Sequence, residues 1–303
     1  MGHSHAHHAD TSDARRRLAL VLGLTVTFTV VEVVGGLLAD SLALLADAGH
    51  MLSDSLSLTV ALVAAWAAQR PATSQRTFGF KRAEILAALF NGVTLVAISI
   101  WIFIEAGRRF DDPPAVEGGL MLGVAVAGLL VNAAGAAILA RGAHDNLNVS
   151  AAMRHVMADL LGSVGVIVAA VVVLATGWNY ADPVVGVVIG VLVLGSSWTI
   201  LRDSTRILLE ATPKGLDAGD VGRQMRALPG IMEVHDLHVW TITSGFPALA
   251  AHVMVAPDDD CHARRREIER MLKSDFGITH TTLQVDHAHE APGLLQIEPR
   301  VER

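Results

Sequence analysis

Long apolar runs separated by short polar connections fill the first two thirds of the chain. Each run holds about 20 residues or more with few charges, which is the length that a helix needs to cross a bilayer. Strands of a membrane barrel would be about half as long. The pattern therefore predicts an α-helical membrane protein with six transmembrane helices, at residues 18–39, 42–68, 83–106, 118–140, 151–176 and 183–201.

The basic residues are unevenly distributed among the connections. One set of connections carries most of them: Arg15, Arg16, Arg17, Arg70, Arg76, Lys81, Arg82, Arg141, Arg154, Arg202 and Arg206. The other set carries only Arg108 and Arg109, beside Asp111 and Asp112. Because basic residues accumulate on the cytoplasmic side, both termini are predicted to be cytoplasmic, in a bacterial inner membrane. The first ten residues have no apolar core, so the first run reads as an uncleaved span and not as a signal peptide.

The last third of the chain has the composition of a soluble domain. Its periodicity predicts, in order, a helix, two strands, a helix and a strand, at residues 216–228, 234–243, 248–255, 262–276 and 281–286. With a further short strand near Ile207, this order fits a small α+β ferredoxin-like domain. We divide the chain into a His-rich cytoplasmic segment, a transmembrane domain, a cytoplasmic domain and a flexible tail, at residues 1–17, 18–206, 207–290 and 291–303.

The totals agree with a membrane protein and exclude several functions. Hydrophobic residues make up 52% of the chain and charged residues 17%, whereas soluble domains carry about 25% charged residues. A net charge of −7 argues against a nucleic-acid partner, because phosphate binding needs a basic face. The single cysteine, Cys261, excludes a disulfide framework and a zinc site built from cysteines.

Two predicted spans repeat the same pair of metal-binding residue types. The second span contains His50 and Asp54, and the fifth contains His155 and Asp159. Residues four apart lie on one helix face, and ionisable groups inside a membrane indicate function. If the two faces meet, two imidazoles and two carboxylates converge. A lone pair of this kind is weak evidence, but two pairs in separate spans predict a metal site over a proton relay or a structural contact.

The ligand types favour zinc. Zn²⁺ takes four tetrahedral ligands and accepts both imidazole and carboxylate, whereas Mg²⁺ and Ca²⁺ prefer six or more oxygens. Cd²⁺, Co²⁺ and Fe²⁺ stay open as alternatives. Four protein ligands close the site, which suits a carrier and not an enzyme, since a zinc hydrolase needs an open position. A channel would need a path of weak sites, so a channel or a metal sensor is a second rival.

The ligands also suggest how transport is driven. Neutral imidazole binds metal, and its protonated form does not. Because histidine titrates at about pH 6.5, a proton gradient can drive metal onto and off the site. We expect metal to bind deprotonated His50 and His155 from the cytoplasm and protons to displace it on the other side.

Three stretches together resemble the cation diffusion facilitator family: LADAGHMLSD at 45–54, HVMAD at 155–159 and VHDLHVW at 234–240. The resemblance covers essentially the whole chain. It implies a homodimer that exports divalent metal in exchange for protons, with a metallochaperone-like cytoplasmic domain and a transport site at His50, Asp54, His155 and Asp159. Two histidines in that site resemble the zinc-preferring branch.

A second metal site is expected in the cytoplasmic domain. His235, His252 and Asp286 fall on three predicted strands, at positions that in the family bind one or two metals at the dimer interface, with His262 as a bridging residue. Gln284 replaces a histidine of some relatives, which argues against a full two-metal cluster. His238 lies three residues from His235, which on a regular strand means opposite faces, so we interpret it as structural.

The remaining polar residues have open interpretations. Asp47 is either a gate residue or a helix-end polar group near Asp40 and Ser41. The His3, His5, His7 and His8 tract is either a metal collector or a dispensable tail. Glu32, Glu105 and Asn132 are expected to form interhelical hydrogen bonds, and Gly35, Gly36, Gly162 and Gly165 to permit close helix packing. The loop at 71–80 lacks the aspartate and two histidines that form a further metal site in some relatives. Arg76 in this loop, with Lys81 and Arg82 directly after it, can pair with lipid phosphates or with acidic groups of the dimer.

Overall fold

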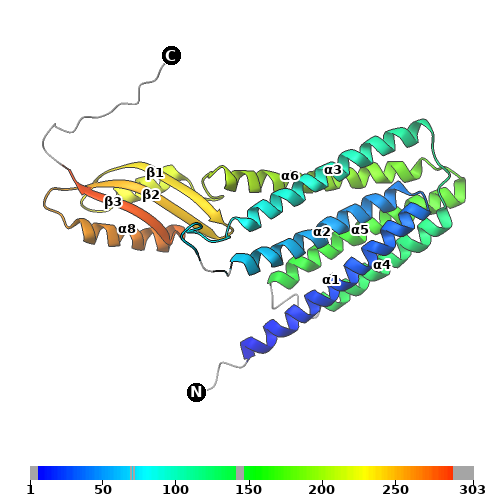
Figure 1. Ribbon diagram of the computed structural model, residues 1–303, viewed down its shortest axis with the longest axis horizontal. Helices are drawn as coiled ribbons and strands as arrows, with labels where there is room; N and C mark the ends of the chain where they lie inside the picture. The colour runs from blue at the N-terminus through cyan, green and yellow to red at the C-terminus, as the bar shows by residue number, and fades with distance from the viewer. Residues whose placement is uncertain (1–5, 69, 71, 141–146, 289–303) are drawn as a thin grey trace, which may run out of the picture. The chain divides into compact units, whose positions relative to one another are not determined.

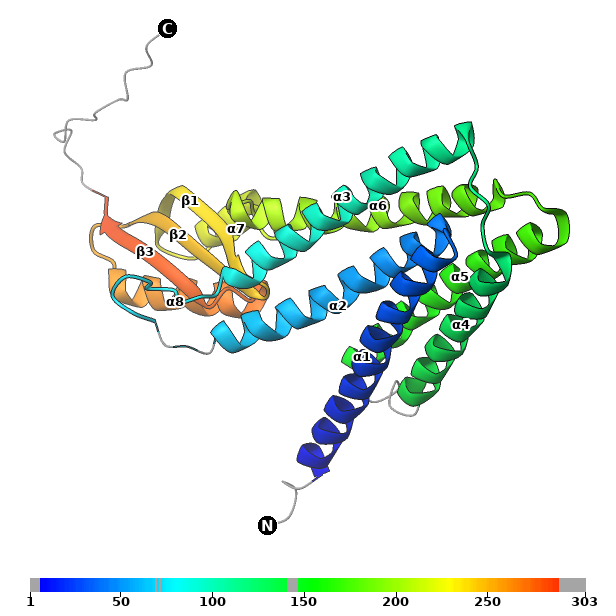
Figure 2. The same cartoon turned by 45° about the vertical axis from the view of Figure 1, so that its right-hand side comes forward.

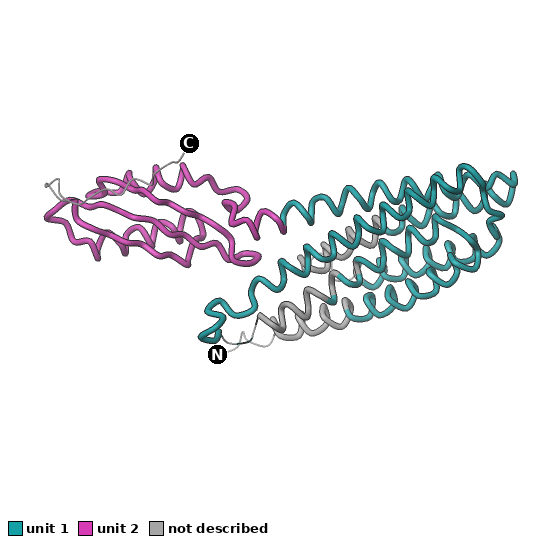
Figure 3. The backbone as a smooth tube through the Cα atoms, turned by 45° about the horizontal axis from the view of Figure 1, so that its top comes forward, with its two compact units in different colours: residues 1–203 teal, residues 204–303 magenta. Residues whose placement is uncertain are grey.

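The protein was analysed as a computed structural model, which describes residues 6–68, 70, 72–140 and 147–288. The side chains of residues 6–18, 54, 57–58, 60–68, 139 and 147–158 lie outside that description. The chain divides into two compact units, Met1–Asp203 and Ser204–Arg303, shown in separate colours in Figure 3.

The first unit is a bundle of helices (Figure 1). In chain order they are α1 (Ala6–Leu38), α2 (Leu42–Ala68), α3 (Ala83–Asp111), α4 (Gly118–Ala140), α5 (Leu147–Thr176) and α6 (Ala181–Leu208). Among the described residues, five of these helices are long and apolar enough to cross a membrane, and α2 contributes a shorter apolar stretch, Leu42–Ser53. The six predicted helices are therefore present, and α1 begins earlier than predicted, at Ala6.

Among the side chains that the structure describes, the buried apolar core of this unit lies toward one end of the bundle. Its apolar members come from the start of α2, the end of α3, the start of α4, the end of α5 and the start of α6: Leu42, Leu44, Ile102, Met121, Ala170 and Ile189 are among them. The short connections α1–α2 and α5–α6 are at this same end (Figure 2). By the predicted topology this is the outer, non-cytoplasmic end, and we call it the outer end.

The second unit is a three-stranded sheet with two helices. Its elements are α7 (Ala218–Arg226), β1 (Ile231–Thr243), β2 (Phe246–Val255), α8 (Cys261–Phe276) and β3 (His280–His287). The strand order is β1-β2-β3, with β1 antiparallel and β3 parallel to β2. Apolar residues of both helices pack with Val234, Leu249 and Val253 of the sheet, so one sheet face is covered and the alternate positions form an open face.

The first strand expected for a ferredoxin-like domain is absent from the described residues. Ile207, predicted to lie in that strand, is in the last turn of α6. The helix ends just beyond it: Glu210 adopts a left-handed φ of 57°, and the amides of Glu210 and Ala211 donate to the carbonyls of Ile207 and Arg206. This pattern satisfies the last helical carbonyls, so the apolar stretch around Ile207 continues the helix instead of starting a strand.

Candidate metal-transport site

The predicted faces of α2 and α5 meet at one described pair of side chains. Nε2 of His50 lies 3.7 Å from Oδ1 of Asp159. The Asp159 side chain is 5% exposed and the His50 side chain 25%. A buried carboxylate beside an imidazole in the middle of two apolar helices is expensive unless it has a function.

The other two predicted ligands are placed only by their helices. Asp54 lies in α2 and His155 in α5, each one turn from its described partner, and their side chains lie outside the described part of the chain. The structure thus brings together two of the four predicted residues and leaves the full ligand set a prediction.

A second polar layer lies on the outer side of this pair. Asp47 of α2 and Glu32 of α1 are both buried, and their carboxyl groups lie close enough to interact. Gly162 of α5 faces Asp47, because a β-carbon at that glycine would lie 3.2 Å from Oδ1 of Asp47. Glu32 therefore lies against a polar side chain of another helix, and the Asp47 carboxylate faces α1 and α5 instead of the helix end.

Further polar contacts join the helices around the site. Oγ of Ser53 donates to Oδ1 of Asn91 at 2.8 Å, which links α2 to α3. Nδ2 of Asn132 donates to Oγ of Ser163 at 3.4 Å, which links α4 to α5. The predicted role of Asn132 in interhelical hydrogen bonding is confirmed, and Asn91 is an addition that the sequence did not single out.

The second unit, which corresponds to the predicted cytoplasmic domain and is called the cytoplasmic unit below, brings His235 and His252 together on the open sheet face. They are directly paired across β1 and β2, and their ring centroids are 5.4 Å apart. Asp286 lies on β3, where it pairs with Met254 and accepts a hydrogen bond from Gln284 at 2.7 Å. His262 starts α8, the helix layer on the other face of the sheet. Among the described residues no three ligand side chains already converge as a metal site.

A β-bulge corrects one sequence-based interpretation. The register of β1 shifts between His235, which pairs with His252, and His238, which pairs with Ala250. Because one extra residue is inserted, His235 and His238 share the open face, and the prediction of opposite faces is wrong. The bulge contains Asp236 at a left-handed φ of 51°. Its carboxylate lies 3.0 Å from Nε2 of His238 and 3.9 Å from Nε2 of His252.

Comparison with known proteins assigns the family. Residues 18–209 match the transmembrane domain of cation efflux proteins, and residues 213–288 match their cytoplasmic domain. The chain belongs to the cation efflux family. It is therefore a multi-pass membrane transporter of cations and not an enzyme.

Similar proteins cover nearly the whole chain. The cadmium, cobalt and zinc/H(+)-K(+) antiporter of Bacillus subtilis is 42% identical over 100% of this chain and 98% of its own length. Zinc transporter ZitB of Escherichia coli is 45% identical over 95% and 93%. Metal cation efflux system protein CzcD of Cupriavidus metallidurans is 43% identical over 95% and 90%. A solved metal-bound C-terminal domain of CzcD is 37% identical over 23% of this chain and 97% of that domain, with a TM-score of 0.22.

Proposed function

We propose that this cation efflux protein exports Zn²⁺ from the cytoplasm in exchange for protons, through His50, Asp54, His155 and Asp159. The observation that carries the proposal is the 3.7 Å approach of His50 and Asp159. Two ligand atoms about 2.1 Å from one tetrahedral zinc lie about 3.4 Å apart. The pair therefore needs only a small closing movement to share a metal ion.

The pairing of α2 with α5 supports the other two ligands. Asp47 of α2 faces Gly162 of α5, and His50, three residues later in α2, faces Asp159, three residues earlier in α5. The residue numbers of the contacting pairs therefore rise along α2 while they fall along α5. The two helices are thus antiparallel in this register. Continued by one turn, this register would bring Asp54 level with His155. The four side chains would then form two adjacent layers on facing helices, which is the arrangement that one tetrahedral ion requires.

The ligand chemistry supports zinc and proton exchange. Imidazole and carboxylate must both be deprotonated to bind metal, so protons and metal compete for the same atoms. Zinc transport is in the name of relatives that match this chain over most of its length. Cadmium and cobalt, named with zinc for the Bacillus subtilis antiporter, and Fe²⁺ are further substrates that this ligand set accepts. The uneven distribution of basic residues supports cytoplasmic termini, and the bacterial relatives support an inner-membrane location.

For the cytoplasmic unit we propose metal binding and homodimer formation through the open sheet face. His235 and His252 supply paired imidazoles there, and Asp286 supplies a carboxylate from the next strand. His262 on the helix layer would have to come from a second copy or through a movement of α8. The match to the cytoplasmic domain of cation efflux proteins supports this assignment.

The function is tested by zinc uptake into proteoliposomes that contain the full chain, with and without an imposed pH gradient. We expect uptake that follows the gradient in the wild type and is lost in His50→Ala. The exposed Asp111→Asn serves as a charge-removal control that keeps uptake. Uptake that persists in His50→Ala would contradict the proposed site.

A potassium arm of the same experiment tests the counter-ion. The Bacillus subtilis relative is named an antiporter for both protons and potassium. Zinc uptake is therefore measured with an opposed potassium gradient at equal pH on both sides. For this chain we expect no zinc uptake above that of the control without a potassium gradient, because the imidazole and carboxylate ligands exchange metal for protons. Potassium-driven uptake would make K⁺ a counter-ion here too.

A further inference from the structure

The first turn of α2 is capped by a residue from another helix. Four amides at a helix start lack partners within the helix. Here Leu42 N and Ala43 N donate to the two carboxylate oxygens of Asp182, at 2.7 and 3.1 Å. Leu44 N donates to Oγ of Ser41 at 3.2 Å. The fourth amide, Leu45 N, donates to the Ser41 carbonyl at 3.3 Å. Oγ of Ser41 itself donates to Asp182 at 2.6 Å. All four amides are thus satisfied.

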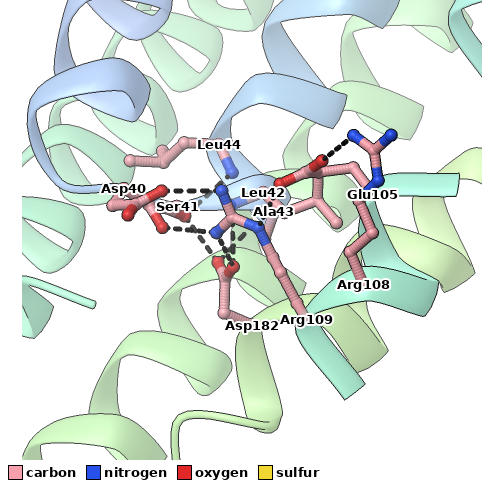
Figure 4. A network of polar contacts seen from close by, with 9 residues as sticks. All are labelled: Asp40, Ser41, Leu42, Ala43, Leu44, Glu105, Arg108, Arg109 and Asp182. Atoms are coloured by element: carbon pink, nitrogen blue, oxygen red, sulfur yellow. Dashed lines mark hydrogen bonds and ion pairs between the residues drawn. The ribbon is translucent and has the colours of Figure 1, made fainter. Parts of the chain in front are cut away.

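Arg109 completes this cap from α3 (Figure 4). Its Nη1 and Nη2 donate to the backbone carbonyl and the carboxylate of Asp40, both at 2.6 Å. Nη1 also lies 3.5 Å from Oδ2 of Asp182. Asp40 has a left-handed φ of 50°, a conformation that costs an L-residue energy and is held here by both arginine contacts. We call Asp40, Ser41, Arg109 and Asp182 the outer clamp.

Three members of the outer clamp, Ser41, Arg109 and Asp182, are buried, whereas the Asp40 side chain is 54% exposed. The Asp182 side chain is fully buried and that of Arg109 is 8% exposed. A buried carboxylate that loses its cation or its hydrogen bonds is strongly destabilised, because water cannot replace them. The neighbouring Arg108 is 74% exposed and forms an ion pair with Glu105 of its own helix, at 3.5 Å. Two consecutive arginines therefore have very different surroundings.

The outer clamp also fixes the two helices that carry the transport site. It holds the first turn of α2, which carries His50 two turns further on. Asp182 lies in the first turn of α6, which follows the end of α5 at Thr176 after a short connection. Its carboxylate therefore ties the outer end of α2 to the start of α6, the helix that this connection joins to α5. The α1–α2 connection is held in addition by Glu117 N, which donates to the Ala39 carbonyl at 3.0 Å. The approach of His50 to Asp159 thus depends on this end of the bundle.

We infer that Arg109 and Asp182 are positioning residues for metal binding: through the outer clamp they set α2 against α5 and hold His50 at the distance from Asp159 that a metal ion needs. The inference rests on the proposed transport site. Loss of a residue that hydrogen-bonds a metal ligand typically lowers metal affinity about 10- to 100-fold, and for residues that act through the position of a helix we expect the lower end of this range. A residue that serves only folding changes the amount of active protein instead.

The test is zinc-dependent transport by the full chain in proteoliposomes, with KM and kcat determined separately for Arg109→Gln and for the matched control Arg108→Gln. We expect Arg109→Gln to raise KM for zinc about 10-fold and Arg108→Gln to leave it within about twofold. Arg109→Lys, which keeps the charge but loses the two-pronged contact with Asp40, should fall between them and serves if the glutamine variant does not fold.

The outcomes distinguish a failure of the positioning role from a failure of the proposed transport site. A KM like that of the wild type in both Arg109 variants, with only kcat or thermal stability lowered, would overturn the positioning role. The double variant Arg109→Gln plus Asp182→Asn should raise KM no more than the larger single effect, because both act through one contact; full additivity would contradict the outer clamp as a unit. If His50→Ala transports zinc with normal KM in the same assay, the proposed site fails independently of Arg109.

Discussion

Gly162 of α5 lies directly against Asp47 of α2: a β-carbon at the glycine would be 3.2 Å from Oδ1 of the carboxylate. This distance is shorter than ordinary van der Waals contact, so a side chain at position 162 must displace either the carboxylate or the helix. The contact is one turn from the His50–Asp159 pair along both helices. The separation of α2 and α5 at the transport site therefore depends on a glycine at this position.

Replacement of Gly162 by alanine is expected to weaken zinc binding. The added methyl group displaces the Asp47 carboxylate or moves α2 away from α5, and a small misplacement of the ligands one turn away is enough to lower affinity several-fold, to about 10-fold. The measurement is the KM for zinc in proteoliposomes. Gly165→Ala is the matched control, because its β-carbon would meet Val185 at 3.8 Å, an ordinary contact. Equal KM values in the two variants would show that this contact does not set the site.

A second glycine tests the packing of α1 on α4. A β-carbon at Gly35 would lie 2.6 Å from Cγ2 of Val124, a stiff side chain. Gly35→Ala should destabilise the protein by about 1–3 kcal/mol, as overpacking does, and lower its melting temperature in detergent. Gly23→Ala in the same helix has no atom within 4 Å of the new carbon and should melt like the wild type. The packing account is wrong if both variants melt alike.

The bulge in β1 predicts opposite effects of two substitutions at Asp236. Valine in the left-handed conformation costs about 1–2 kcal/mol, so Asp236→Val should lower the melting temperature of the cytoplasmic unit. Asp236→Gly adopts a φ of 51° without strain and should melt at or above the wild-type temperature. Thr241→Val in the same strand is the control for valine itself. If Val and Gly at position 236 are equally stable, the strand is regular there.

The cap of α8 predicts a pH dependence. Oδ1 of Asp260 accepts hydrogen bonds from Ala263 N and His262 N at 3.0 and 2.9 Å. The bond from Ala263 is the main cause that lowers the pKa of Asp260 below its usual 3.8, with the His262 amide and the nearby Arg266 charge acting in the same direction. A carboxyl whose pKa is lower in the folded state stabilises it above pH 3.8 and loses that effect as the pH falls through the lowered value.

We therefore expect Asp260→Ala to speed amide hydrogen exchange in the first turn of α8 at neutral pH. The difference from the wild type should shrink as the pH falls below 3.8, since protonated Asp260 no longer accepts as a carboxylate. The exposed Asp258→Ala is the control and should exchange like the wild type at every pH. A difference between Asp260→Ala and wild type that is the same at neutral and acid pH would refute the charge-dependent cap.

The helices and the meeting of α2 with α5 were predictable from the sequence. Apolar runs of membrane length define the six helices, and the repeated His-x-x-x-Asp spacing identifies the two faces that carry His50 and Asp159. These features are local patterns that a bilayer environment makes decisive. Two helices and three strands of the cytoplasmic unit were predictable because each has its own periodicity, whereas the strand expected near Ile207 is the end of α6.

The β1 bulge, the end of α6 and the outer clamp were not predictable, because they depend on backbone conformations and long-range contacts that leave no local sequence pattern. Asp236 and Glu210 adopt left-handed backbone conformations where glycine would have been the expected indicator, so the bulge and the end of α6 were missed. Asp182 looks like an ordinary residue at a helix start, and its role as the cap of α2 follows only from a contact 140 residues away in sequence. The difference between Arg108 and Arg109 likewise arises from burial alone.

Proton-coupled zinc export through His50 and Asp159 is tested by measuring proton movement driven by zinc. Proteoliposomes holding a pH-sensitive dye receive external zinc with no imposed gradient, and internal pH and zinc are followed together for the wild type and Asp159→Asn. The account predicts that zinc entry makes the interior more alkaline in the wild type, because protons leave in exchange, and that both signals vanish in the variant. Zinc entry without a pH change, or an unchanged pH response in Asp159→Asn, would contradict proton-coupled export through this site.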